Sequence, residues 1–124
     1  MSNSNPMVNI RMSQIQQLYS FFPNIVVTGR TQTCEDHRIP LLLTRANQPL
    51  FCRVSIPFQF PQMAPSINIM HRVVHDKISK DGNYLYNGEK LTNWKGHSNL
   101  LAVIRQMHQE FEMAPPIPEG LLQQ

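Results

Sequence analysis

The stretch Leu50–Met70, LFCRVSIPFQFPQMAPSINIM, decides the fold, because it holds a strand, a proline-rich turn and a second strand. In its first part, apolar residues alternate with others, and one face carries Leu50, Cys52, Val54 and Ile56. This period of two predicts a half-buried antiparallel strand over Leu50–Ile56. Prolines at positions 61 and 65 exclude a central strand in the middle part. Ser66–Met70 is the next predicted strand.

Two further strands are predicted before this stretch. Asn24–Thr28 is a β-branched run closed by a glycine, and Ile39–Thr44 joins Leu50–Ile56 through about five residues that include Gln48-Pro49. Within the second of these strands, the run Leu41-Leu42-Leu43 has two interpretations. It is either an exposed partner surface or part of a strand buried on both faces.

Two helices flank the predicted strands. Apolar spacing predicts the first over Ile10–Phe21, ended by Pro23, and its outward residues are expected to be Gln14, Gln16 and Gln17. A wide apolar stripe from Leu100 to Phe111 predicts the second helix, with Ser98 as its cap. The order of elements predicts an α+β domain with helices packed on one four-stranded antiparallel sheet.

Length and composition bound the function. The 124 residues suggest one domain, and the 41% apolar and 15% charged content is typical of a globular chain. No apolar run approaches the ~20 residues of a membrane-spanning helix, and the N-terminus does not read as a secretory signal. The net charge of +3 is spread along the chain, which argues against a nucleic-acid-binding face. We expect a flexible leader over residues 1–9, one domain over 10–118 and a tail over 119–124.

Reactive thiols and metal ligands have weak support. Cys52 lies on the apolar face of its predicted strand, which favours a buried thiol, and Cys34 is followed by two acidic residues that would raise a thiol pKa. The spacings Cys34-x-x-His37 and His71-x-x-x-His75 are similar to zinc-ligand spacings but fall in different segments. We therefore expect no metal and no cofactor.

The segment from Phe60 to Trp94 carries a family resemblance. Pro61 and Pro65 fit the pattern Tyr-Pro-x-x-x-Pro, His75 stands ten residues after Pro65, and Gly82 stands seven residues after His75. This spacing resembles that of the ubiquitin-conjugating enzymes, in which His75 would match the histidine of the His-Pro-Asn signature. The resemblance places the catalytic cysteine at Leu85 and the oxyanion-stabilising asparagine at Lys77.

Neither Leu85 nor Lys77 can do the chemistry of the residue that it replaces. The chain thus resembles a ubiquitin-conjugating-enzyme variant (UEV) domain, which keeps the fold without thioester chemistry. Ala-Pro-Pro-Ile-Pro at 114–118 follows the second helix, where active enzymes add two more helices, and this ending is similar to the UEV domains of ESCRT-I. The N-terminal domain of the vacuolar protein sorting thirty-seven subunit is the most similar type, on the phrases at 18–25, 57–62, 81–85, 97–100 and 110–116.

The resemblance implies a non-catalytic adaptor of ESCRT-I in endosomal (multivesicular body) sorting of ubiquitinated cargo. The alternative is a UEV cofactor of an active conjugating enzyme in polyubiquitin chain formation, and a third reading is an active enzyme that uses Cys34 or Cys52. An adaptor would be cytoplasmic, held at the endosomal membrane periphery by other ESCRT-I subunits, with ubiquitin or Pro-rich peptides as further partners. The predicted hairpin is short beside the ubiquitin-gripping hairpin of the tumour-susceptibility type. Partner-binding candidates are Leu43, Arg45, Phe51, Tyr86 and Trp94. Trp94 is also expected to anchor its loop onto the sheet.

Overall fold

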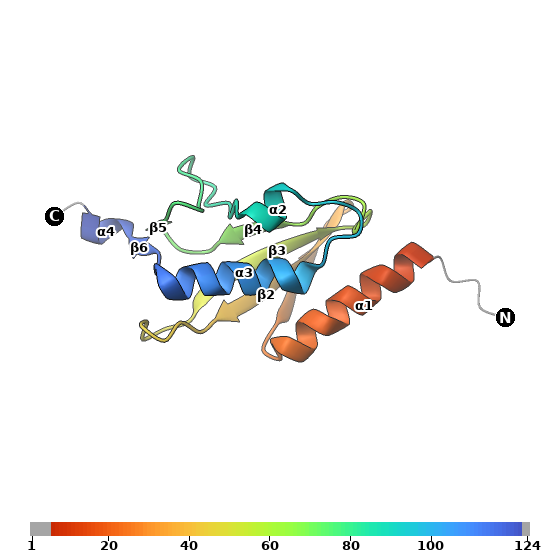
Figure 1. Ribbon diagram of the computed structural model, residues 1–124, viewed down its shortest axis with the longest axis horizontal. Helices are drawn as coiled ribbons and strands as arrows, with labels where there is room; N and C mark the ends of the chain where they lie inside the picture. The colour runs from red at the N-terminus through yellow and green to blue at the C-terminus, as the bar shows by residue number, and fades with distance from the viewer. Residues whose placement is uncertain (1–5, 123–124) are drawn as a thin grey trace.

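The structure is a computed structural model that describes residues 6–122 (Figure 1). In chain order its elements are α1 (Pro6–Phe21), β1 (Val26–Arg30), β2 (Cys34–Leu41), β3 (Leu50–Pro57), β4 (Ser66–Ile69), β5 (Val73–Val74), α2 (Glu89–Thr92), α3 (Leu100–Met113), β6 (Ile117–Pro118) and α4 (Glu119–Leu122). Four strands form an antiparallel sheet in the order β1-β2-β3-β4, and β5 pairs with β6 in a separate ribbon. The predicted α+β domain with a four-stranded antiparallel sheet is confirmed.

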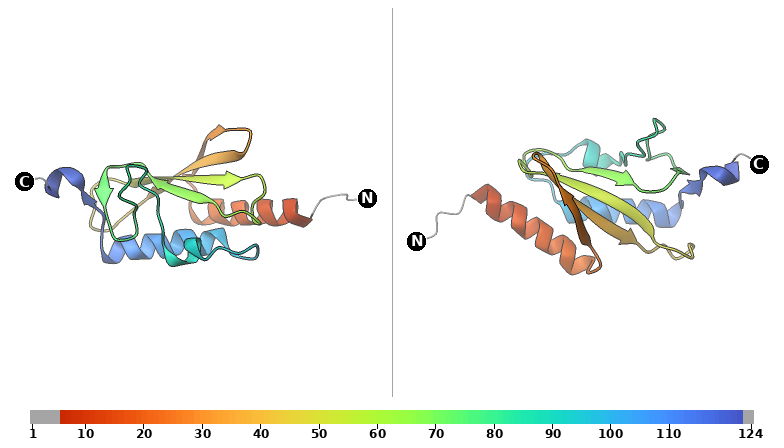
Figure 2. Two further views of the ribbon diagram at one scale, coloured as in Figure 1. Left: turned by 90° about the horizontal axis from the view of Figure 1, so that it is seen from above. Right: turned by 180° about the vertical axis from the view of Figure 1, so that it is seen from behind.

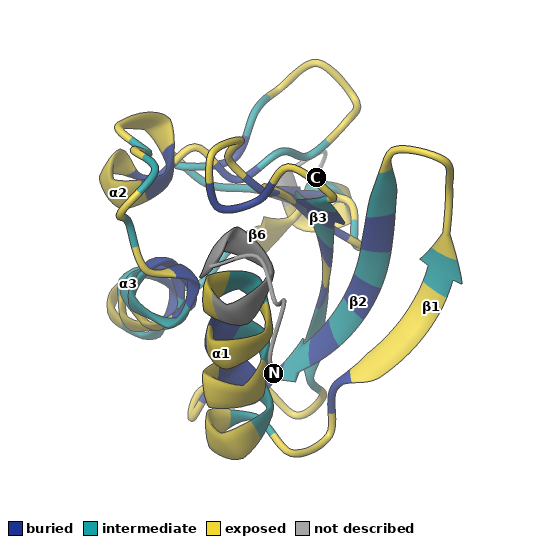
Figure 3. Cartoon of the chain, turned by 90° about the vertical axis from the view of Figure 1, so that its right-hand side faces the viewer, coloured by how far each residue is buried: buried dark blue, intermediate teal, exposed yellow. Residues whose placement is uncertain are grey.

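The helices α1 and α3 lie on the same face of the sheet, as Figure 2 shows. Side chains of β2 alternate between half-buried and buried along its whole length, and β3 shows the same period over Cys52–Ile56. The buried rows of both strands face the helices. Among the described residues no helix covers the opposite face, and β1 at the edge is largely exposed (Figure 3).

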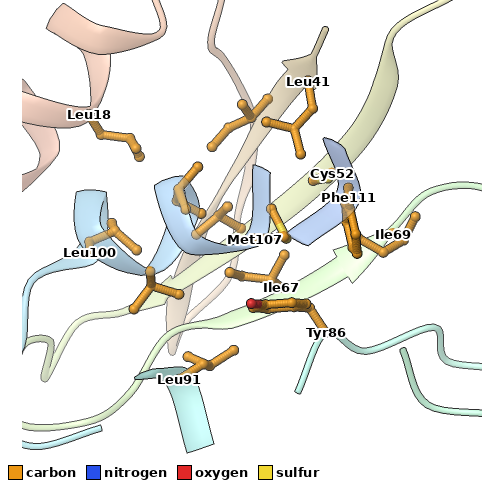
Figure 4. Packing of buried hydrophobic residues seen from close by; sticks show 14 of the residues in the cluster. Leu18, Leu41, Cys52, Ile67, Ile69, Tyr86, Leu91, Leu100, Met107 and Phe111 are labelled. Atoms are coloured by element: carbon orange, nitrogen blue, oxygen red, sulfur yellow. The ribbon is translucent and has the colours of Figure 1, made fainter. Parts of the chain in front are cut away.

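The core fills the space between the sheet and the two long helices (Figure 4). Helix α3 contributes one stripe at helical spacing, namely Leu100, Val103, Ile104, Met107 and Phe111. Strands β2, β3 and β4 contribute fully or almost fully buried residues, namely Ile39, Leu41, Cys52, Val54, Ile56, Ile67 and Ile69. Leu18 is the fully buried residue of α1. The apolar spacing that predicted α3 is thus the spacing that builds the core.

Helix α1 begins earlier than predicted. It starts at Pro6, so residues 6–9 are helical rather than part of a flexible leader, and residues 1–5 of that predicted leader lie outside the described residues. Proline is favoured in the first helical turn, because its missing N–H has no partner there in any helix. The predicted end at Phe21, before Pro23, is confirmed.

Gln14 was predicted on the outward face of α1 and is instead buried. Its Nε2 donates to the Ser98 carbonyl at 3.0 Å, and its Oε1 accepts from the Leu100 N–H at 2.7 Å. A polar side chain that satisfies backbone groups at a helix start is compatible with burial. Gln14 therefore joins α1 to the beginning of α3.

The cap of α3 is Asn99, not the predicted Ser98. The Asn99 Oδ1 accepts from the Ala102 N–H at 2.9 Å, whereas Ser98 Oγ accepts from the Lys95 N–H in the preceding turn. Asparagine is among the preferred N-cap residues, and either side chain fits the local sequence. The position of the preceding turn decides between them.

The predicted strand over Ile39–Thr44 has the wrong bounds, since β2 spans Cys34–Leu41. Its first half reads CEDHR, and hydrophobic periodicity cannot reveal a strand whose buried side chains are Glu35 and His37. The connection to β3 covers residues 42–49 rather than five residues. Neither interpretation of the leucine run holds for all three residues, because Leu41 and Leu43 are buried while Leu42 is 66% exposed.

Candidate functional site

Two of the residues that the family resemblance singles out, Lys77 and Leu85, lie in one short antiparallel ladder between β5 and α2. The Ser79 N–H donates to the Leu85 carbonyl at 2.8 Å, and the Leu85 N–H donates to Ser79 Oγ at 2.9 Å. Two residues along, the Asn87 N–H donates to the Lys77 carbonyl at 2.8 Å. The structure thus places Lys77 and Leu85 on the two facing segments of this ladder, with Lys77 opposite Asn87 and Leu85 opposite Ser79.

The same ladder extends the main sheet. The Ile69 N–H donates to the Tyr84 carbonyl and the Tyr86 N–H donates to the Ile67 carbonyl, both at 2.8 Å. The segment Tyr84–Tyr86, whose residue types suit a strand, therefore covers the free edge of β4. Leu85 is half-buried and lies between β4 and the segment 77–79.

A tight turn closes the ladder at Asp81-Gly82. The Asp81 carboxylate accepts bonds from the Asn83 N–H at 3.0 Å and Ser79 Oγ at 2.9 Å, and these bonds, the Asn83 bond first, hold the pKa of Asp81 below its ordinary value. Gly82 has φ +89°, which glycine adopts without strain, and Tyr84 has φ +52°. Tyr84 is held there at both ends, because its carbonyl accepts from the Ile69 N–H and its hydroxyl donates to Glu119 at 2.6 Å.

His75 lies next to the ladder, and neither of its ring nitrogens is available to a ligand. Its Nδ1 accepts from the Lys77 N–H at 3.0 Å, so in the neutral ring Nε2 carries the hydrogen. That Nε2 is buried without a hydrogen-bond partner, and the ring meets Phe111 edge-on with centroids 4.9 Å apart. His75 thus orients the Lys77 backbone and presents no free nitrogen to a substrate.

Tyr86 was predicted as a partner-binding residue, and its burial contradicts that role. It is 3% exposed, packs edge-on against Phe111 with centroids 5.9 Å apart, and donates its hydroxyl to Glu110. Burial, followed by the bond to Glu110, raises the pKa of the Tyr86 hydroxyl. The amphipathic tyrosine is a core residue with one internal partner.

Trp94 anchors its segment of the chain, but not onto the sheet as expected. Its Nε1–H donates to the Pro61 carbonyl at 2.8 Å, and its ring lies 5.4 Å from that of Phe60, centroid to centroid. The contact fixes the segment after α2 onto the turn between β3 and β4, rather than onto the strands themselves. The ring remains half-buried.

A groove of about 580 Å³ lies between the β2–β3 connection and the C-terminal segment. Leu43 and His71 line it together with Pro115, Pro116 and Pro118. The C-terminal wall is held in place by the β5–β6 pairing and by the Glu119 N–H, which donates to the Arg72 carbonyl at 3.0 Å. Of the predicted partner residues, only Leu43 lines this groove, while Arg45 is exposed on the adjoining loop.

Phe51 borders the groove through a stack of side chains on the outer face of the sheet. Its ring is stacked on His71 with centroids 5.9 Å apart, and the Arg38 guanidinium carbon lies 5.2 Å from the Phe51 ring centroid. The Phe51 N–H also donates to His71 Nε2 at 3.0 Å. The sequence offered His71 only as a metal ligand, and no local pattern pointed to its contact with a strand twenty residues away.

The two thiols lie outside these features. Cys52 is fully buried, and burial raises the pKa of its thiol far above the ordinary value. Cys34 is half-buried at the start of β2, 3.4 Å from Thr31 Oγ1 and 3.7 Å from Asp36 Oδ1. Its position on the strand puts it on the opposite face from His37, so this pair does not converge. In the described part of the chain, no three His, Cys, Asp or Glu side chains are grouped so as to hold a metal ion.

No family model matches this chain, and comparison with curated proteins returns no match.

Proposed function

We propose that this chain is a non-catalytic adaptor domain of the UEV type, acting within ESCRT-I in endosomal (multivesicular body) sorting of ubiquitinated cargo. The observation that carries the proposal is Leu85. Its side chain has no nucleophilic atom, and its backbone N–H and carbonyl both bond to Ser79. At the position where the resemblance puts a reactive cysteine, the chain therefore has a structural residue.

The surroundings of Leu85 support the same proposal. Lys77 contributes its backbone N–H to His75 and its carbonyl to Asn87, so its main chain holds the ladder together. An active enzyme would instead need a thiolate beside a group that activates it. Cys52 is buried with a raised pKa, and Cys34 lies beside Asp36.

An adaptor works by binding, and the groove beside Leu43 with the exposed Arg45 is the surface we propose for it. The partners are other ESCRT-I subunits, with ubiquitin or a Pro-rich peptide as ligand. The contact of one small adaptor domain with its ligand is weak when isolated, and it becomes effective when several domains act in one assembly. We place the domain in the cytoplasm, at the periphery of the endosomal membrane through the complex. Among the described helices, none has the length and apolarity to cross a bilayer.

A thioester assay with activating enzyme, ATP and ubiquitin tests the absence of catalysis. We expect no adduct that dithiothreitol removes, while an active conjugating enzyme run in parallel gives one. A dithiothreitol-sensitive adduct that disappears in Cys34→Ser or Cys52→Ser would contradict the proposal and favour an active enzyme with a displaced nucleophile.

An NMR titration of the labelled domain with ubiquitin tests the ligand. We expect shifts in residues 43–51 that weaken in Arg45→Glu and persist in Arg53→Glu, which reverses an exposed charge on β3. Absence of shifts would contradict ubiquitin binding. Copurification with other ESCRT-I subunits tests the adaptor role separately, and a stable complex with a conjugating enzyme in their place would contradict it.

A further inference from the structure

A second surface, on the opposite side of α3 from the ladder, combines an apolar hollow with cations that form no ion pair with any described residue. The hollow measures about 250 Å³ and lies where the end of α1, the end of β2 and the middle of α3 meet (Figure 1). Its lining is mostly apolar or aromatic and includes Phe21, Phe22, Pro40 and Leu42. Drug-sized ligands occupy clefts of about 300–1,000 Å³, so this hollow suits a single large side chain.

Two residues of the hollow expose apolar surface that folding leaves uncovered. Leu42 is 66% exposed and Phe21 is 49% exposed. The rim is nevertheless fixed, because His108 Nε2 donates to the Leu42 carbonyl at 2.8 Å and the rings of Phe21 and Phe22 are 5.1 Å apart. A preformed apolar hollow with a fixed rim suits an inserted side chain better than a mobile loop would.

The charged side chains that line this surface have one sign. A second hollow of about 650 Å³ shares Phe21 and His108 with the first and continues along α3 past Lys90 and Arg105. Among the described residues that line the two hollows, none is Asp or Glu. Glu112 lies 3.6 Å from His108, but its carboxylate already accepts bonds from the Thr44 N–H and hydroxyl.

Arg105 is positioned over the junction of the two hollows. Its guanidinium carbon lies 4.9 Å from the centroid of the Phe21 ring, within cation–π range. In the part of the chain that the structure describes, neither Arg105 nor Lys90 forms an ion pair. The guanidinium is therefore held by an aromatic face with its donors available to a carboxylate.

We propose that this α1–α3 surface docks a short acidic segment of a partner protein. One apolar side chain of the segment fills the hollow beside Leu42, and a neighbouring carboxylate binds Arg105. An exposed aromatic ring paired with arginine, beside an apolar anchor site, has the composition of an interaction hot spot. Two cations around a hollow are too few for the many phosphate contacts of nucleic acid or for a polybasic membrane site. The proposal is independent of the ubiquitin-related function.

Defined peptides test the docking surface by NMR titration of the labelled full chain. The probes are acetylated, amidated peptides with two glutamates on each side of a Leu-Phe, Ile-Phe or Leu-Trp pair. Control peptides carry lysine in place of glutamate, or Ser-Ser in place of the apolar pair. We expect saturable shifts at Leu42, Arg105 and His108 with the acidic apolar probes alone. No shifts from any of the three probes at millimolar concentration would overturn the proposal.

Variants separate docking from general electrostatics. Arg105→Glu is expected to weaken binding about tenfold, and Leu42→Ser about fivefold. The controls are Arg53→Glu, an exposed arginine on β3, and Met113→Ser, an apolar residue that is 76% exposed at the end of α3. Equal loss in a control and its partner variant would overturn the proposal. Tighter binding at these residues by a single-stranded oligonucleotide or by vesicles containing phosphatidylserine would overturn it in favour of those ligands.

Discussion

Gln14 on α1 accepts a 2.7 Å hydrogen bond at Oε1 from the backbone N–H of Leu100, the first residue of α3. Both residues are buried, and the four N–H groups at a helix start need partners from outside the helix. The first helix of the chain therefore completes the start of the last long one.

Replacing Gln14 with alanine is expected to lower the free energy of unfolding by about 1–3 kcal/mol, because the buried Leu100 N–H loses its partner. Urea unfolding followed by circular dichroism measures the change. Gln16→Ala is the matched control, since Gln16 is exposed on the same helix, and it should stay within about 0.5 kcal/mol of the wild type. Equal effects of the two variants would contradict a stabilising role of the interhelix bond.

Gly88 should not accept a side chain. A Cβ at this position would overlap the hydroxyl and ring of Tyr86, and Tyr86 is buried and bonded to Glu110. We expect Gly88→Ala to cost about 1–3 kcal/mol of unfolding free energy, as other overpacking substitutions do. At Gly29 a Cβ would meet nothing within 4 Å, so Gly29→Ala is the control and should change stability little. A neutral Gly88→Ala variant would contradict the packing described for Tyr86.

The free energy of unfolding should decrease as the pH is lowered, because of the buried side chain of His37. Its Nε2–H donates to Glu35 at 2.9 Å and its Nδ1 accepts from the Tyr19 hydroxyl at 2.7 Å, which is the pattern of a neutral ring. Burial lowers the pKa of His37, and this outweighs the opposing effect of Glu35. Below the ordinary histidine pKa of about 6.5, this histidine is protonated in the unfolded chain but stays neutral in the folded chain. The free energy of unfolding therefore falls as the pH is lowered.

Glu35 acts in the same direction at lower pH. Burial alone would raise its pKa, but the bonds from Arg30 and His37 outweigh burial and the pKa is lowered, so its stabilising contribution is lost as the carboxylate protonates.

Urea titrations at several pH values between 7.5 and 5.5 should show a smaller slope for His37→Gln than for the wild type. The exposed His97 gives the control variant His97→Gln, whose slope should match the wild type. Identical slopes for all three proteins would contradict a neutral, buried His37.

The two thiols should differ in reactivity toward iodoacetamide. Cys34 is half-buried, whereas Cys52 is fully buried with its thiol pKa raised by burial. Mass spectrometry of the native protein at pH 8 should find the label on Cys34 alone, and labelling in urea should modify both. Labelling of Cys52 at a similar rate in the native protein would contradict its burial beneath α3.

Sequence patterns predicted the parts of the fold whose core residues are apolar. The alternation around Val54 gave β3, and the stripe ending at Phe111 gave α3, because each pattern is the buried face of its element. The start of β2 was missed, since its buried positions are Glu35 and His37, which are stabilised by the hydrogen bond between them, by the Arg30–Glu35 ion pair and by Tyr19. Gln14 was misplaced for the same reason, because its burial depends on backbone groups that are distant in sequence.

The candidate site likewise combines residues that the sequence suggested with contacts that it did not. The sequence singled out Lys77 and Leu85 one by one, and only the structure shows that they lie on the two facing segments of one short ladder. Of the two tyrosines beside Leu85, Tyr86 is the buried one. The residue types alone do not reveal which of the two is buried. The stacking of Phe51 on His71 and of Arg105 on Phe21 joins segments that share no local pattern, so only the three-dimensional arrangement shows it.

Trp94 is the one tryptophan of the sequence, and its indole hydrogen bond to Pro61 makes it a natural spectroscopic reporter. Its emission will follow the turn between β3 and β4, not the exposed edge at β1 or the surface beside Arg105. A fluorescence titration that responds to a ligand therefore signals a rearrangement near this turn. A ligand that shifts NMR signals while leaving the emission unchanged has bound elsewhere on the domain.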